Sequence, residues 1–184
     1  MNRSELAHIL RAACDVTSDP GILVLGSQAL LASFDDDELP STVVRSIEAD
    51  IAFFDDPDER KSDAVDGAIG EESMFHQTNG VYGQGVSVST AVLPEGWRSR
   101  VVAFDGPDAE PSRAVCLEPH DLVISKLVAG RPKDREFARE LVAHGLVDFV
   151  ILSERAALLP VPGAVKRRVL AAIDSVIRDR GRTP

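Results

Sequence analysis

Two stretches of this sequence decide the fold: residues 22–31, Ile-Leu-Val-Leu-Gly-Ser-Gln-Ala-Leu-Leu, and residues 46–54, Ser-Ile-Glu-Ala-Asp-Ile-Ala-Phe-Phe. The first opens with consecutive apolar residues, which is typical of a buried central strand. Gly-Ser then ends that strand, and a helix is expected to begin near Gln28. In the second stretch, apolar and acidic residues alternate over positions 47–51, which predicts a half-buried strand. The sequence therefore predicts a strand, a turn, a helix and a second strand.

An acidic pair stands on the second of these strands. Residues two positions apart on a strand point to the same face, so Glu48 and Asp50 are expected side by side, with Ile47, Ala49 and Ile51 facing the core. Neighbouring carboxylates repel each other, and a divalent cation removes that cost. Carboxylate oxygens suit Mg²⁺ that is bound jointly with phosphates. Taken alone, such a pair is more often a solvated strand face.

The Gly26-Ser27 turn complements the acidic pair. A glycine at the end of a buried strand lets the backbone approach a ligand closely. The N–H groups of a helix that starts there attract an anion such as a phosphate. Taken alone, a Gly-Ser pair is more often an ordinary turn.

The rest of the chain separates into a mixed part and a helical part. We expect helices at 4–16, 61–69, 119–130, 132–144, 148–159 and 163–178, and strands at 81–92, 99–104 and 114–117. The expected fold class is α/β (α+β), with a short mixed sheet followed by a C-terminal helical bundle. The expected domains are an α/β core over 1–117 and a helical region over 118–184 that completes a cleft.

Composition narrows the class of protein. Of the 184 residues, 44% are apolar and 27% charged, which is too apolar for a disordered chain. No stretch is long and apolar enough to cross a membrane, and no signal peptide is expected. The two cysteines, Cys14 and Cys116, are far apart, which favours core positions in a reduced, cytoplasmic protein.

The net charge of −10 is unevenly distributed. Residues 1–112 hold 7 basic and 21 acidic side chains, whereas residues 113–184 hold 13 basic and 9 acidic ones. The acidic part argues against nonspecific binding of nucleic acid. The basic run Lys166-Arg167-Arg168 could contact RNA phosphates, although a solvated helix face explains it equally well.

The combination of motifs resembles a known family. Gly26-Ser27-Gln28-Ala29-Leu30-Leu31 and Glu48-Ala49-Asp50-Ile51 resemble the Gly-Ser and acid-x-acid motifs of minimal nucleotidyltransferases, which share the polymerase β-type fold. Residues 121–134, Asp-Leu-Val-Ile-Ser-Lys-Leu-Val-Ala-Gly-Arg-Pro-Lys-Asp, look like a segment of bacterial nucleotidyltransferase-like proteins grouped with the AbiEii and MenT toxins. The resemblance covers roughly residues 20–160, and the run around Lys126 is its most specific part.

The resemblance implies an Mg²⁺-dependent nucleotidyltransferase. Gly26 and Ser27 would hold the phosphates of a nucleoside triphosphate, and Glu48 and Asp50 would bind Mg²⁺. By the same resemblance the acceptor is tRNA or another RNA, and a cognate antitoxin is a possible protein partner.

The helical part would contribute further charged groups. The resemblance implies that Lys126 reaches the triphosphate as a point charge, with Arg131 and Lys133 extending that positive surface. Asp134 would match a downstream aspartate that orients the acceptor or the lysine.

The sequence departs from the family pattern in two ways. Glu48 stands where the first aspartate is expected, and the next expected strand brings no third carboxylate: residues 86–89 contain no acid, and Asp105 stands at a strand end. The alternative is therefore a catalytically inactive member that binds a nucleotide or a partner. His76 and Tyr82 are further candidates for contact with a base, although structural roles explain both.

Overall fold

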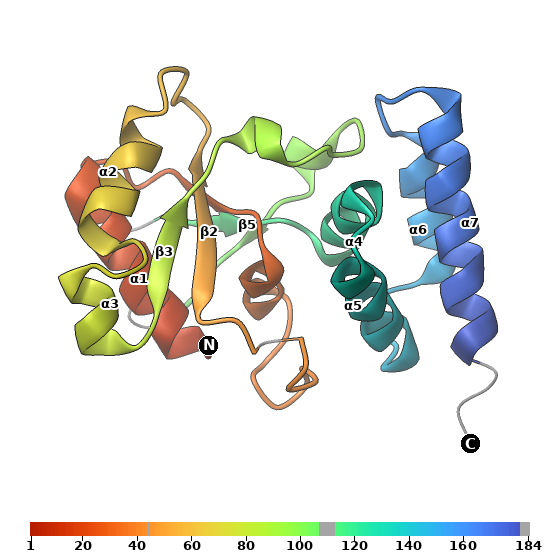
Figure 1. Ribbon diagram of the computed structural model, residues 1–184, viewed down its shortest axis with the longest axis horizontal. Helices are drawn as coiled ribbons and strands as arrows, with labels where there is room; N and C mark the ends of the chain where they lie inside the picture. The colour runs from red at the N-terminus through yellow and green to blue at the C-terminus, as the bar shows by residue number, and fades with distance from the viewer. Residues whose placement is uncertain (44, 107–112, 181–184) are drawn as a thin grey trace. The chain divides into compact units, whose positions relative to one another are not determined.

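The computed structural model describes residues 1–43, 45–106 and 113–180 (Figure 1). The chain forms two compact units. We call residues 1–91 together with 101–117 the α/β unit, and residues 92–100 together with 118–184 the helical unit. Each unit is described by itself.

The α/β unit is built on a mixed sheet, as expected for the fold class. Its strands are β1 (Ile22–Val24), β2 (Glu48–Phe53), β3 (Tyr82–Gly85), β4 (Val102–Ala103) and β5 (Val115–Cys116). Their order across the sheet is β3-β2-β1-β5-β4. β2 is antiparallel to β1 and parallel to β3, while β5 is parallel to β1 and antiparallel to β4. The acidic strand β2 is thus an interior strand of the sheet.

Helices of this unit cover one face of the sheet (Figure 1). They are α1 (Arg3–Thr17) and α2 (Arg60–Ile69). The short α3 (Met74–Asn79) contacts β3, where its His76 lies against Tyr82, and the 3₁₀ segments η1 (Ser27–Ala32) and η2 (Val88–Thr90) lie elsewhere in the unit. A Cβ atom at Gly83 of β3 would lie 3.1 Å from Ile9 of α1 and 3.0 Å from Ile69 of α2. The close packing of α1 and α2 on this face leaves the acids of β2 on the opposite one.

The helical unit consists of α4 (Pro119–Ala129), α5 (Pro132–Ala143), α6 (Phe149–Ala157), α7 (Gly163–Arg180) and the 3₁₀ turn η3 (Trp97–Ser99). Its polar centre is Asp121 on α4, which is 1% exposed. Arg100 donates Nε to Asp121 Oδ2 at 2.7 Å and Nη2 to Oδ1 at 3.0 Å. Arg155 of α6 lies 3.4 Å from Asp121 Oδ1. These ion pairs join the segment 92–100 to α4 and α6.

The structure corrects several expected elements. The strand expected at 81–92 is only Tyr82–Gly85, because Gly85 packs against the backbone of Ser62 and the chain then turns into η2. The strand expected at 99–104 is only Val102–Ala103. The segment after Gly26 is a 3₁₀ helix of 6 residues. His76 lies on α3, a short helix that is not among the expected ones.

The structure bears on two expectations from the composition, which concern the cysteines and membrane-spanning helices. Cys14 and Cys116 are both buried and neither forms a disulfide, so the expected core positions are confirmed. Within the described ranges, no helix is long and apolar enough to cross a membrane. A cytoplasmic location stays a prediction.

Close packing at Gly85 gives a stability prediction. A Cβ atom at this position would lie 2.0 Å from the Ser62 carbonyl oxygen, so Gly85→Ala must displace α2. We expect this substitution to lower the free energy of unfolding by roughly 3 kcal/mol, as overpacking does. Chemical denaturation of the variant and the parent protein measures the difference.

The matched control is Gly67→Ala, on the exposed side of α2. No atom lies within 4 Å of a Cβ atom built at Gly67, and alanine is the better helix former. We expect this variant to be more stable by about 1 kcal/mol. Equal stability of the Gly85→Ala variant and the parent protein would contradict the packing described for β3 and α2.

Candidate active site

The register of β2 with β3 determines which side chains accompany the acidic pair. Glu48 is paired with Tyr82, and Asp50 with Gln84. Both acids are half-buried, whereas Ala49 between them is fully buried. Paired residues of parallel strands point to the same face, so Glu48, Asp50, Tyr82 and Gln84 share one face of the sheet.

One residue of the expected alternation differs. Ile47 is 47% exposed, although it was expected in the core with Ala49 and Ile51. The reason is that β2 begins at Glu48, so Ile47 precedes the strand and its side chain is not held in the strand's alternation. Its carbonyl still accepts a hydrogen bond from Tyr82 N–H at 3.0 Å.

Gly26 and Asp50 meet at the end of β1. Leu25 N–H donates to the Asp50 carbonyl at 3.1 Å, which holds the two chain segments together. A Cβ atom at Gly26 would lie 1.8 Å from Asp50 Oδ2. Gly26 has an ordinary φ of −82°, so the glycine is needed for this close approach rather than for its backbone angle. The Asp50 carboxylate therefore lies directly against the Gly26-Ser27 turn.

Glu48 is held by a tyrosine. The Tyr82 hydroxyl donates a hydrogen bond to Glu48 Oε2 at 3.1 Å, and Tyr82 is 7% exposed. Burial, followed by the negative charge of Glu48, raises the pKa of Tyr82 to about 12. The His76 ring lies 4.7 Å from the Tyr82 ring, centroid to centroid. This gives His76 and Tyr82 structural roles beside the acidic pair.

Sequence reasoning did not single out Gln28 as a site residue. Its side chain is fully buried, and Nε2 donates to the Ser46 carbonyl at 2.9 Å. Ser46 Oγ in turn accepts a hydrogen bond from Glu48 N–H at 3.1 Å. Gln28 thus ties η1 to the start of β2. The sequence offers no signal for this contact, because it joins residues 18 positions apart.

The donor set fits Mg²⁺ only in part. Glu48 and Asp50 supply hard carboxylate oxygens, which is the chemistry that Mg²⁺ prefers. The described residues contain no group of three His, Cys, Asp or Glu side chains that could hold a metal. Gln84, in register with Asp50, donates instead to Asp66 at 3.0 Å. Mg²⁺ would therefore bind here with phosphate oxygens completing its coordination.

Asp105, the other candidate for a third carboxylate, is separated from the acidic pair. It follows β4, which lies three strands from β2 in the sheet order. Neighbouring strands are about 4.8 Å apart, so this separation is roughly 14 Å. The backbone carbonyl of Asp105 accepts a hydrogen bond from Arg3 at 2.9 Å.

The remaining predicted site residues belong to the helical unit. Lys126 lies on α4 with Nζ 4.7 Å from the ring centroid of Phe137. Asp134 is 4% exposed, and its Oδ2 accepts a hydrogen bond from Arg131 N–H at 3.1 Å, which closes the first turn of α5. Lys133 is exposed on that same turn. The proposed roles of these residues toward a nucleotide stay predictions.

The basic run on α7 is partly used within the helical unit. Lys166 Nζ donates to the Ala157 carbonyl at 2.8 Å. Arg168 Nη2 donates to the Val128 carbonyl at 2.8 Å. Both bonds are at the surface, so they orient these side chains without removing their charge from solvent.

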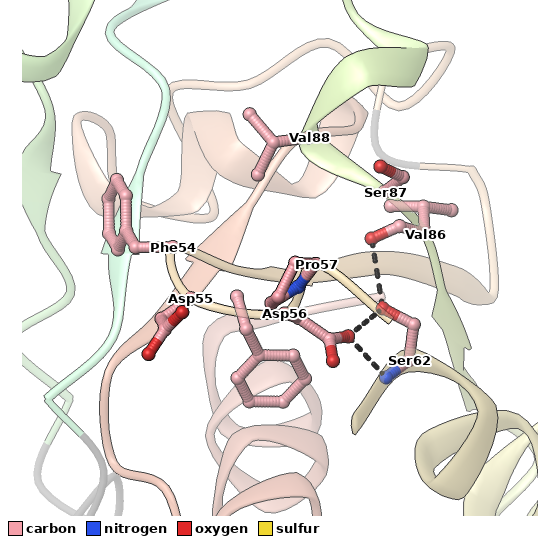
Figure 2. Close-up of a pocket in the computed structure, with 9 residues that line it drawn as sticks. Phe54, Asp55, Asp56, Pro57, Ser62, Val86, Ser87 and Val88 are labelled. Carbon is pink, nitrogen blue, oxygen red and sulfur yellow. Dashed lines mark hydrogen bonds between the residues drawn. The ribbon is translucent and has the colours of Figure 1, made fainter. Parts of the chain in front are cut away.

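A separate hollow lies at the far end of β2 (Figure 2). Its volume is about 200 Å³, and it is lined by residues 53–57, 62 and 86–88. Asp56 points at the first turn of α2, where its carboxylate accepts hydrogen bonds from Ser62 N–H and Oγ, both at 2.9 Å. Burial opposes ionisation of Asp56, but hydrogen bonds from Lys61 and Ser62 hold its pKa below the ordinary value. Asp56 therefore already accepts the N–H groups of Lys61 and Ser62 that a phosphate at this helix start would need.

Comparison with protein families gives a match. A family described as a nucleotidyltransferase of unknown function (DUF6036) matches residues 4–162. The chain belongs to this family. No curated protein and no solved structure matches the chain. Membership in DUF6036 supports a nucleotidyltransferase-like domain and leaves the AbiEii and MenT grouping as a resemblance.

The contact between Glu48 and Tyr82 in this DUF6036 protein predicts a titration. Tyr82 is the only tyrosine, so the ultraviolet absorbance of phenolate reports its ionisation alone. In Glu48→Gln we expect the pKa of Tyr82 to fall below about 12 but to stay above the ordinary value, because the carboxylate charge is removed while burial, the larger cause, remains. An unchanged ionisation would contradict the contact.

The same shift affects stability at alkaline pH. The pKa of Tyr82 in the folded protein lies above its ordinary value of 10.0. The protonated tyrosine therefore contributes to the free energy of unfolding, and this contribution is fully present below pH 10. It is lost as the pH rises toward about 12. Circular dichroism at each pH serves as the control that the absorbance change is measured on folded protein.

Proposed function

We propose that this protein is an Mg²⁺-dependent nucleotidyltransferase that moves a nucleotide from a nucleoside triphosphate to an acceptor. One observation carries the proposal: Glu48 and Asp50 share a face of the sheet, and the Asp50 carboxylate lies against the backbone of Gly26. Membership in a nucleotidyltransferase family supports it independently.

The residues of the α/β unit have distinct roles in this proposal. Bound Mg²⁺ would neutralise charge on the phosphates during transfer. Glu48 and Asp50 would hold the metal, and Gly26 would admit the phosphates close to the chain. Since η1 has only 6 residues, its dipole is small, and the Ser27 hydroxyl is the group that we expect to donate to a phosphate oxygen.

For the helical unit, the proposal rests on the resemblance of residues 121–134 to bacterial nucleotidyltransferase-like proteins. Lys126 would supply a positive charge to the triphosphate, and Arg131 and Lys133 would add to it. Asp134 is buried on its own helix turn, where it holds Arg131 N–H. We therefore propose that Asp134 acts by orienting this basic turn.

The biological role and the acceptor of the nucleotide are part of the same proposal. Resemblance to the AbiEii and MenT toxins favours a toxin of a toxin–antitoxin pair, with tRNA as the acceptor and an antitoxin protein as the partner. The basic side chains of the helical unit are the groups suited to an RNA backbone, because the α/β unit is strongly acidic.

A second candidate function is favoured by Gln84. This amide stands in register with Asp50 on the neighbouring strand, where the described residues bring no third carboxylate. A missing acid removes one metal ligand and the usual general base. On this hypothesis the protein binds a nucleotide, or a partner, without transferring anything.

A labelling experiment separates the two functions. Each of four nucleoside triphosphates, labelled at the α-phosphate, is incubated with the protein, Mg²⁺ and total bacterial RNA. We expect one nucleotide to label RNA and Asp50→Asn to abolish the label, because the amide is a far weaker metal ligand than the carboxylate. Asp63→Asn, on the exposed side of α2, is the matched control and should label normally.

The outcomes of this experiment are distinct. Label on the protein itself would replace the RNA acceptor by a protein one. Absence of label from both, with the nucleotide still bound, would establish the non-catalytic function. Label that persists in Asp50→Asn would refute the assignment of the metal site.

Binding is tested separately by thermal unfolding. We expect Mg²⁺ and the triphosphate together to stabilise the protein, and either alone to do so much less, because the described residues bring two carboxylates, Glu48 and Asp50, to the proposed metal site. A ligand at 100 times its dissociation constant adds about 2.7 kcal/mol to the free energy of unfolding. Full stabilisation by the nucleotide in the presence of a chelator would contradict metal-dependent binding.

A further inference from the structure

The side chain of Glu48 is more flexible than that of an aspartate at the same position. It has one more rotatable bond, so its carboxylate samples more positions before a metal arrives. Ordering a free glutamate side chain costs conformational entropy, which weakens binding. A metal site that uses glutamate on a half-buried strand therefore gains from a second group that holds the carboxylate in place.

Tyr82 is placed to be that group. It is paired with Glu48 across β2 and β3, and its hydroxyl donates to Glu48 Oε2 at 3.1 Å. The tyrosine is itself held: it is 7% exposed, and the His76 ring lies against it. His76 is fixed in turn, because its Nδ1 accepts a hydrogen bond from Glu72 N–H at 3.1 Å. A buried, packed donor thus points at one oxygen of Glu48.

We propose that Tyr82 is a positioning residue for the metal site: it holds Glu48 by Oε2 and leaves Oε1 to bind Mg²⁺. Side chains that hydrogen-bond a metal-ligating carboxylate orient it and raise metal affinity, and their loss typically costs 10- to 100-fold. This inference rests on the proposed function, because Mg²⁺ with a nucleotide is the ligand. It assigns no contact between Tyr82 and the reacting atoms.

The test is a double-mutant cycle that reads metal affinity instead of activity. Four proteins are compared: wild type, Tyr82→Phe, Glu48→Ala and the double variant. Each is mixed in turn with each of four non-hydrolysable nucleoside triphosphates. The melting temperature is followed as Mg²⁺ is added. The readout is the Mg²⁺ concentration that gives half of the nucleotide-dependent stabilisation.

We expect Tyr82→Phe to raise this Mg²⁺ concentration by about 10-fold. In the Glu48→Ala background, the same substitution should change nothing further, because the carboxylate that it orients is gone. Thr17→Val is the matched control: it deletes a hydroxyl that donates to the Ala13 carbonyl on α1, away from the acidic face, and should respond as wild type does.

Other outcomes would overturn the inference. An unchanged Mg²⁺ requirement in Tyr82→Phe, with wild type responding, refutes the positioning role and leaves the proposed function intact. An equal loss in both backgrounds shows that Tyr82 acts through packing alone. Absence of any nucleotide-dependent stabilisation in wild type refutes the proposed ligand, and the inference with it.

Discussion

The antiparallel pairing of β1 with β2 is the constraint on which the candidate site depends. It brings the end of β1 beside the first residues of β2, so the backbone of Gly26 lies against the side chain of Asp50. The approach is so close that a single methyl group at Gly26 would overlap Asp50 Oδ2. The strand register, which is set by the burial of apolar side chains, thereby places the Asp50 carboxylate against the Gly26-Ser27 turn.

The second carboxylate is held in a different manner. Glu48 depends on β3, the neighbouring parallel strand, for the hydroxyl that binds it. The electrostatic consequence appears on the tyrosine, whose ionisation is suppressed by burial and by the carboxylate charge. The acidic pair is therefore supported on one side by the Gly26 turn and on the other by Tyr82.

The helical unit is organised around a buried ion-pair cluster. Its centre is a buried aspartate, Asp121, with the guanidinium groups of Arg100 and Arg155 around it. Removing one partner from such a cluster leaves an uncompensated buried charge, which is strongly destabilising. The cluster explains why the segment 92–100 packs with the helices, although the chain on both sides of it belongs to the α/β unit.

Local patterns in the sequence determined the elements that have a strong period. The spacing of apolar residues predicted the strand at 22–24 and the alternation of Ala49 and Ile51 with the acids. Proline at a helix start predicted the helices that begin at Pro119 and Pro132. Patterns were weakest over residues 81–104, where glycines and serines carry no period. There the backbone of Ser62 against Gly85 decides where the strand ends.

The sequence by itself determined that Glu48 and Asp50 share a strand face and that a Gly-Ser turn follows a buried strand, because both depend only on neighbours along the chain. Tertiary structure alone decided what holds these groups. Tyr82 lies 34 positions from Glu48, and Gln28 lies 18 positions from Ser46. Such contacts arise from the order and register of strands, which a local pattern does not encode, since pairing is chosen by the burial of the whole sheet.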